Sequence, residues 1–134
     1  MKSLREGEQP NLLYSENHVW VRVQNHTIVL GITDFMQKQL GNVIRVLFLN
    51  EGLIEKGSPL ALLESVKMFV AVLSPINCEV IKVNARLEIE PTLINKEPYG
   101  EGWIAIVKPL DEDQLRSLKD FEIYQQFIST LSRY

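Results

Sequence analysis

The segment ALLESVKMFVAVLSP, residues 61–75, decides the fold that the rest of the sequence supports. It holds one lysine, Lys67, in a run that is otherwise almost wholly apolar, and Glu64 stands three residues before it. Residues 59–64 and 68–73 have the apolar, β-branched character of strands, so the lysine falls at a tight hairpin between them. Burying a lysine among apolar side chains would cost free energy, and we therefore expect its amine to project into water at the hairpin tip.

This amine has two interpretations. A lysine on a surface turn is in most proteins only a solvated charge. It can also be a modification point, because a rigid turn gives a fixed anchor and a long prosthetic arm supplies the reach. Such a division of roles suits a carrier that visits several active sites, with Lys67 as the attachment residue.

Outward from the hairpin, the sequence predicts many short strands with turns every eight to twelve residues or so. The further strands are expected over residues 18–24, 26–32, 42–49, 78–84 and 102–109. A short helix is predicted over residues 33–41, where Thr33 or Asp34 can cap the start and Gly41 can end it. From Asp111 on, apolar residues recur at helical spacing. The pattern indicates a mainly β fold, a sandwich or barrel with helical additions.

Composition narrows the class of protein. The chain has 134 residues and a net charge of -3, which indicates one domain and gives no basic patch for nucleic acid or membrane binding. The single cysteine, Cys78, excludes an internal disulfide framework. No apolar run reaches the length of a membrane span, and residues 1–14 lack a signal-peptide core, so we expect a cytoplasmic protein. We find no metal cluster, no nucleophile–histidine–acid set and no phosphate loop in the sequence.

Five ordered blocks resemble the glycine cleavage system H protein family. They are ESVK (residues 64–67), YSENHVWVRV (14–23), LGITDFMQKQLGNVIRV (30–46), SPINCEVIKVN (74–84) and LINKEPYGEGWIAIVKP (93–109). The resemblance implies the flattened antiparallel β-barrel or sandwich hybrid of lipoyl and biotinyl carriers. It also implies a single H-protein-like domain over residues 1–134, with a barrel core at about 14–109 and a C-terminal helical segment at 111–132.

The resemblance further implies a covalent cofactor. Lys67 would be an N6-lipoyllysine, and Glu64 would serve recognition by the lipoylating machinery, a lipoate ligase or lipoyl synthase system. The protein would be a non-catalytic carrier that moves an aminomethyl group between glycine decarboxylase, aminomethyltransferase and dihydrolipoyl dehydrogenase. A mobile carrier is most useful as a monomer.

Two departures from the family pattern lie near the lysine. Met68 follows Lys67, and biotin carriers flank their lysine with methionine, so a biotin carrier stays an alternative. Cys78 stands where the family often has a turn glycine, which indicates a different turn there.

A third departure concerns the cleft in which the family docks its arm. The candidate cleft residues are Asn17, Val19, Phe35 and Ala71, and at the last three positions the family often has polar side chains. An apolar cleft fits a neutral or soft sulfur cargo better than a cationic amine. This favours the alternative of an H-like lipoate-binding protein that carries sulfur intermediates beside a heterodisulfide-reductase-like complex. A lipoyl-relay carrier and an unmodified scaffold are further alternatives.

Overall fold

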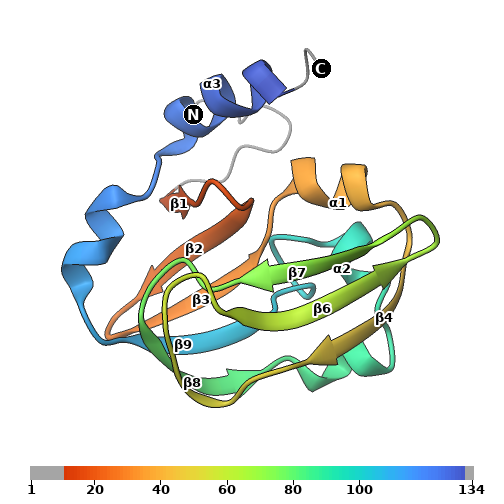
Figure 1. The fold of residues 1–134 in the computed structure, drawn as a ribbon, viewed down its shortest axis with the longest axis horizontal. Helices are drawn as coiled ribbons and strands as arrows, with labels where there is room; N and C mark the ends of the chain where they lie inside the picture. Colours follow the sequence, from red (N-terminus) through yellow and green to blue (C-terminus); the bar gives the residue numbers. More distant parts are fainter. Residues whose placement is uncertain (1–10, 132–134) are drawn as a thin grey trace, which may run out of the picture.

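Two antiparallel sheets form the protein in a computed structural model that describes residues 11–131 (Figure 1). The six-stranded sheet has the order β1 (Leu12–Tyr14), β2 (Val19–Gln24), β3 (Thr27–Ile32), β9 (Ala105–Pro109), β8 (Cys78–Val83), β5 (Gly52–Ile54). The three-stranded sheet has the order β4 (Val43–Phe48), β6 (Pro59–Ser65), β7 (Phe69–Leu73). The two sheets do not join into one closed barrel, and the predicted mainly β sandwich is confirmed.

Short helices connect and cover the sheets. They are α1 (Asp34–Leu40), the 3-10 turn η1 (Ala85–Glu88), α2 (Leu93–Lys96), the 3-10 helix η2 (Glu112–Ser117) and α3 (Phe121–Leu131). The predicted helix after the second long strand is confirmed as α1, whose first turn is capped by the Thr33 hydroxyl accepting from the Met36 N–H. No helix within residues 11–131 is long and apolar enough to cross a membrane.

The main core lies between the two sheets. Alternate residues of β2 and β3 face inward, including Val19, Val21 and Leu30, and all three side chains are fully buried. From the other sheet, Leu63 of β6 and Val72 of β7 meet them. The residues beside the predicted hairpin therefore belong to strands that are anchored in the core.

A second apolar cluster covers the outer face of the six-stranded sheet. Tyr14 and Trp20 are buried there, and the ring of Tyr124 from α3 stacks on Tyr14 with centroids 4.7 Å apart. The helix α3 thus closes a face that would otherwise expose large aromatic surfaces to water.

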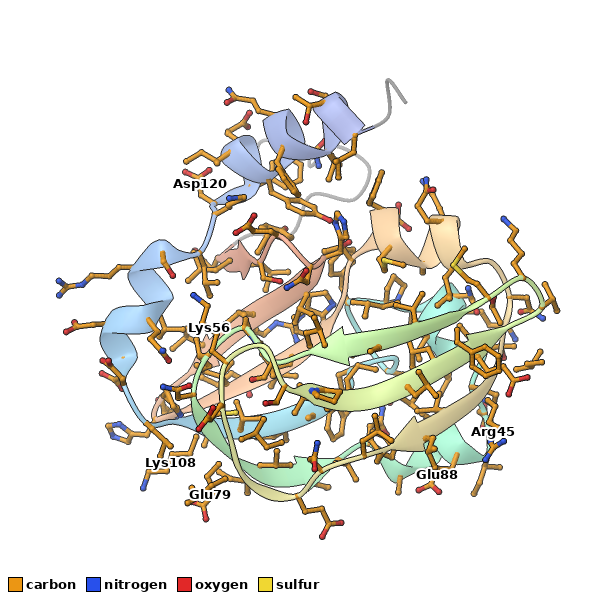
Figure 2. The ribbon with its side chains drawn as sticks, viewed as in Figure 1. Arg45, Lys56, Glu79, Glu88, Lys108 and Asp120 are labelled. Atoms are coloured by element: carbon orange, nitrogen blue, oxygen red, sulfur yellow. The ribbon has the colours of Figure 1, made fainter. Side chains whose placement is uncertain are left out.

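The sequence predicts helical character from Asp111 onward, but in the structure an extended stretch divides this C-terminal segment into two helices. Lys119 pairs with Tyr14 as an isolated bridge, so the chain is extended between η2 and α3. Asp120, which Figure 2 labels just before α3, then starts this helix, because its carboxylate accepts from the Ile123 N–H. Residues 132–134 of the predicted segment, and residues 1–10 of the predicted domain, lie outside the described residues.

Two short strands differ from the sequence expectations. The strands β1 and β5, each of three residues, were not predicted, since so short a run carries little periodicity. Cys78 begins β8, as the strand predicted from residue 78 requires, and its side chain is buried in the core. Burial raises the pKa of its thiol, which is held as a buried apolar group.

Candidate functional site

Lys67 lies at the tip of the hairpin that joins β6 and β7, where the sequence places it. The turn residues Val66 to Met68 are all exposed, and the strands on either side pair in register from Glu64 with Phe69 onward. Figure 1 shows this turn projecting at one edge of the molecule, beside the connection from α1 to β4. The amine is therefore accessible on a support that is continuous with the core.

The side chain of Ser65 shapes the turn. Its hydroxyl oxygen accepts hydrogen bonds from the backbone N–H groups of Lys67 and Met68, both at 3.0 Å. The Ser65 N–H donates to the Met68 carbonyl at 2.8 Å and closes the hairpin. Serine hydroxyls hold local turns in this way, so the backbone of the lysine is fixed although its side chain is free to extend.

Glu64 belongs to β6 and not to the turn itself. It is half-buried, pairs with Arg45 of β4 across the sheet, and borders a small apolar hollow of about 50 Å³. The other residues of that hollow are Arg45, Leu47, Leu62 and Phe69. The carboxylate thus lies on the outer face of the three-stranded sheet, one strand position away from the hairpin that carries Lys67.

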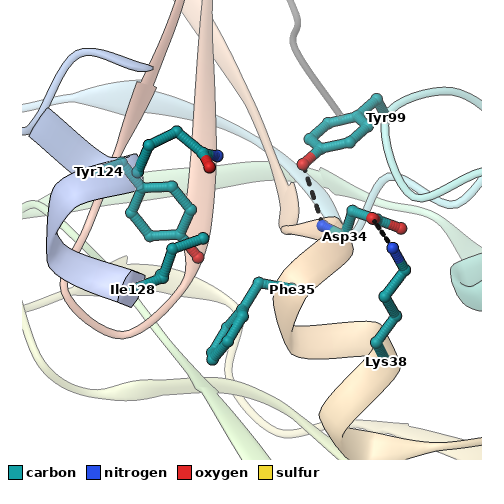
Figure 3. Close-up of a pocket in the computed structure, with 7 residues that line it drawn as sticks. Asp34, Phe35, Lys38, Tyr99, Tyr124 and Ile128 are labelled. Atoms are coloured by element: carbon teal, nitrogen blue, oxygen red, sulfur yellow. Dashed lines mark hydrogen bonds and ion pairs between the residues drawn. The ribbon is translucent and has the colours of Figure 1, made fainter. Parts of the chain in front are cut away.

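Phe35 lines a larger hollow of about 240 Å³, which we name the Phe35 pocket (Figure 3). Its lining residues are Asp34, Phe35, Lys38, Tyr99, Tyr124, Gln125 and Ile128. The walls are the start of α1, the loop before β9 and the inner side of α3. Two of these residues are joined by a hydrogen bond, in which the Tyr99 hydroxyl accepts from the Asp34 N–H at 2.9 Å.

One acid lines this pocket, and it is already paired. The carboxylate of Asp34 lies 2.9 Å from the Lys38 Nζ and accepts at 2.9 Å from the Gln37 amide. Asp34 was not predicted as a cleft residue, because the family resemblance places its cleft acids at the positions of Val19 and Ala71. The pocket therefore offers a carboxylate whose charge is compensated from its own helix.

The other three candidate cleft residues do not line the Phe35 pocket. Val19 is fully buried in the core between the sheets, where a glutamate would place a carboxylate among apolar side chains. Ala71 is exposed on β7, and Asn17 lines a separate hollow beside Lys56. Of the four residues, the structure places Phe35 alone at a pocket wall formed with α3.

The hydroxyl of Tyr124 ties α3 to the start of α1. It lies 2.7 Å from the Thr33 Oγ1 and 2.8 Å from the His18 Nδ1. Burial raises the pKa of Tyr124 far above its ordinary value, so the group stays a neutral phenol. Tyr124 lines the Phe35 pocket, and this role was not predicted from the sequence.

Comparison with known proteins decides the family. A model described as "Glycine cleavage H-protein" matches residues 12–131, which include both sheets, the Lys67 hairpin and α3. The chain belongs to the glycine cleavage H-protein family. The resemblance found in the five sequence blocks is thereby confirmed.

Individual members of this family match nearly the whole chain. A glycine cleavage system H protein of Coprothermobacter proteolyticus is 44% identical over 119 residues, which are 87% of this chain and 94% of that protein. A probable glycine cleavage system H protein of Pyrococcus furiosus is 42% identical over 131 residues, 96% of this chain and 94% of that protein. None of these descriptions names a sulfur pathway, so the comparisons give that alternative no support.

A solved H-protein structure shares the fold. The crystal structure of a glycine cleavage system H protein from Mycobacterium marinum matches with a TM-score of 0.79, over 87% of this chain and 95% of that one. The two sequences are 22% identical, so this likeness concerns the arrangement of strands and helices.

The half-buried His18 gives a pH-dependence that can be measured. The rings of Phe35, Tyr124 and Phe127 surround the His18 imidazole, and burial lowers its pKa from the ordinary value of about 6.5. Below that pH the unfolded chain binds a proton that the folded chain resists, so the free energy of unfolding should fall as pH falls. In His18→Asn this contribution should be absent, and asparagine tolerates the positive φ of 66° at this position.

The measurement is urea denaturation of both proteins between about pH 7.5 and about pH 5.5. The wild type should lose more stability over this range than His18→Asn does. His26→Asn, which changes an exposed histidine in the turn after β2, is the control and should behave as the wild type. Equal losses in the wild type and His18→Asn would contradict the assignment.

Proposed function

We propose that this chain is a lipoyl carrier of the glycine cleavage system, with lipoamide attached to the amine of Lys67. The observation that supports it most directly is the exposed lysine at the tip of a core-anchored hairpin, in a chain of the H-protein family. The role is that of a carrier component that other enzymes act on.

The residues present fit a covalent lipoyl group. The Lys67 amine would attack the carbonyl carbon of an activated lipoyl group such as lipoyl adenylate, forming an amide while AMP leaves and the amine gives up a proton. Ser65 holds the lysine backbone in one geometry for this attack, which leaves the alkyl chain as the mobile part. When bound, lipoamide supplies a strained disulfide that opens to a dithiol and can hold cargo on sulfur.

We propose the Phe35 pocket as the place where the chain shelters the end of such an arm. Phe35 and Ile128 supply apolar surface, and the Asp34–Lys38 pair supplies polarity without an uncompensated charge. Tyr99 and Tyr124 keep the walls in place through their hydroxyl hydrogen bonds. The pocket residues would exclude water from one side of the arm.

The partners follow from the proposed role. They are the lipoate ligase or lipoyl synthase machinery for loading, and glycine decarboxylase, aminomethyltransferase and dihydrolipoyl dehydrogenase for use. Glu64 stays the proposed recognition residue for loading. A cytoplasmic location and a monomeric state stay predictions of the sequence.

The proposal is tested by loading and then by use. The purified protein is incubated with a lipoate ligase, lipoate and ATP, and intact mass with peptide mapping should show one lipoyl group on Lys67. The loaded protein is then given glycine and glycine decarboxylase, and should take up the one-carbon amine fragment. A biotin increment already present on the protein before this incubation would identify a biotin carrier. No increment would identify a scaffold, and loading without glycine-dependent uptake would place the carrier in another pathway.

A further inference from the structure

The Lys67 side chain lies close to a glycine at the end of α1. Gly41 ends α1 with φ of 79°, a left-handed conformation that favours glycine. A Cβ atom placed on Gly41 would lie 3.3 Å from the Lys67 Cε and 3.6 Å from its Cδ. The methylene chain of the lysine therefore rests along the bare backbone of residue 41.

The same loop also holds the backbone of the turn. The Val66 N–H, next to the lysine, donates to the Asn42 carbonyl at 3.2 Å. Val43, one residue on, pairs with Ser65 in the sheet. The hairpin tip is thus joined to the connection between α1 and β4 by backbone as well as by side-chain contact.

One side chain from a distant helix holds this connection in place. The Asn95 amide nitrogen donates to the Gly41 carbonyl at 2.8 Å and to the Gln37 Oε1 at 3.1 Å. Its amide oxygen accepts from the Val43 N–H at 2.9 Å. Asn95 belongs to α2, whose residues Leu93 and Ile94 are buried, so the connection is braced against the core.

We propose that Gly41, Asn42 and Asn95 form a cradle that positions the Lys67 hairpin for its modifying enzyme and sets the course of the lysine chain along the end of α1. Gly41 supplies the flat contact surface, Asn42 the carbonyl that holds the turn, and Asn95 the bridge to the core. These are positioning residues, since they act through Lys67. This proposal rests on the proposed function in one respect, because that function identifies lipoyl attachment as the reaction for which the Lys67 amine is positioned.

The cradle has a direct consequence for loading. If the hairpin moves among several orientations, only a fraction of molecules presents the amine correctly, and the apparent affinity of the ligase for the carrier falls by that fraction. Once bound correctly, the amine reacts as before. Damage to the cradle should therefore raise KM for the carrier with a smaller change in kcat.

The first test compares Gly41→Ala with Gly52→Ala. Both glycines have positive φ angles, 79° and 76°, so alanine is strained at each. Nothing lies within 4 Å of a Cβ on Gly52, whereas on Gly41 it meets Lys67. With lipoate ligase, lipoate and ATP, Gly41→Ala should raise KM for the carrier about tenfold, while Gly52→Ala should stay within about twofold of the wild type.

The second test compares Asn95→Ala with Asn84→Ala. Asn84 also donates through its side-chain amide to two carbonyls, those of Glu101 and Trp103, both at 2.8 Å, but it does not contact the hairpin connection. Each variant loses bridging hydrogen bonds, so a general loss of stability should appear in both. The rise in KM should appear in Asn95→Ala and not in Asn84→Ala.

Hydrogen exchange gives a readout that does not depend on loading. In the unmodified protein, the Val66 amide should exchange faster in Asn95→Ala than in the wild type or Asn84→Ala, because its acceptor on Asn42 loses its support. If the wild type takes up no lipoyl group, the proposed function fails. The exchange rate of the Val66 amide then tests by itself whether the cradle holds the hairpin. Unchanged exchange at Val66 in Asn95→Ala, or equal KM values for Gly41→Ala and Gly52→Ala, would overturn it.

Discussion

Replacing Lys67 by arginine is expected to abolish lipoyl loading completely while leaving the fold unchanged. The guanidinium group keeps the positive charge and the length of the side chain, but it stays protonated and does not act as an acyl acceptor under these conditions. The turn geometry depends on the Ser65 hydroxyl and the backbone, neither of which the substitution touches. After incubation with lipoate ligase, lipoate and ATP, intact mass should show no added group.

Lys56→Arg is the matched control for this experiment. Lys56 is exposed in the turn between β5 and β6, so it is a second lysine on a surface turn of the same protein (Figure 2). This variant should load as the wild type does. A lipoyl group on Lys67→Arg, or loss of loading in Lys56→Arg, would show that the ligase does not select the hairpin between β6 and β7.

The hairpin could be predicted because its determinants are local. Strand-forming residues flank Lys67 on both sides, and burial of a lysine is costly, so only a turn satisfies the sequence. The same holds for α1, whose capping threonine, short apolar pattern and terminal glycine stand within a single stretch of the chain. Local signals therefore sufficed to place Lys67 at the tip of a hairpin.

The Phe35 pocket could not be predicted because its walls meet only in three dimensions. The Tyr124 hydroxyl contacts Thr33 across 91 positions of sequence, and the Tyr99 hydroxyl contacts Asp34 across 65. Nothing in the local pattern near α1 indicates either partner. The bridge from Asn95 to Gly41 spans 54 positions and was missed for the same reason.

The burial of Val19 in the core was not predicted, for a different reason. The stretch from Val19 to Val23 carries apolar residues on both faces of β2, since Trp20 packs on the outer cluster while Val19 and Val21 pack in the main core. Alternation identifies the buried face only when the other face is polar. Matching a family motif gave the position of Val19 along the strand but not what its side chain contacts.

Gly102→Ala is expected to destabilise the protein by about 3 kcal/mol or more, because the new methyl group would strike backbone atoms that cannot move independently. A Cβ on Gly102 would lie 2.5 Å from the Leu93 carbonyl oxygen, 2.7 Å from that of Glu97 and 3.0 Å from the Ile94 Cα. Gly102 is buried, and its own N–H donates to the Glu97 carbonyl at 2.8 Å.

Gly100→Ala is the control for this experiment. It distinguishes the steric clash predicted at Gly102 from a general sensitivity of the loop to substitution. Neither glycine has a left-handed φ, and a Cβ on Gly100 first meets the end of the flexible Glu97 side chain at 3.3 Å. Urea denaturation should therefore give a midpoint near that of the wild type for Gly100→Ala and a much lower one for Gly102→Ala; equal midpoints would contradict the steric argument. Because the displaced backbone belongs to α2, which carries Asn95, the Val66 amide of Gly102→Ala should also exchange faster under conditions in which the chain is still folded.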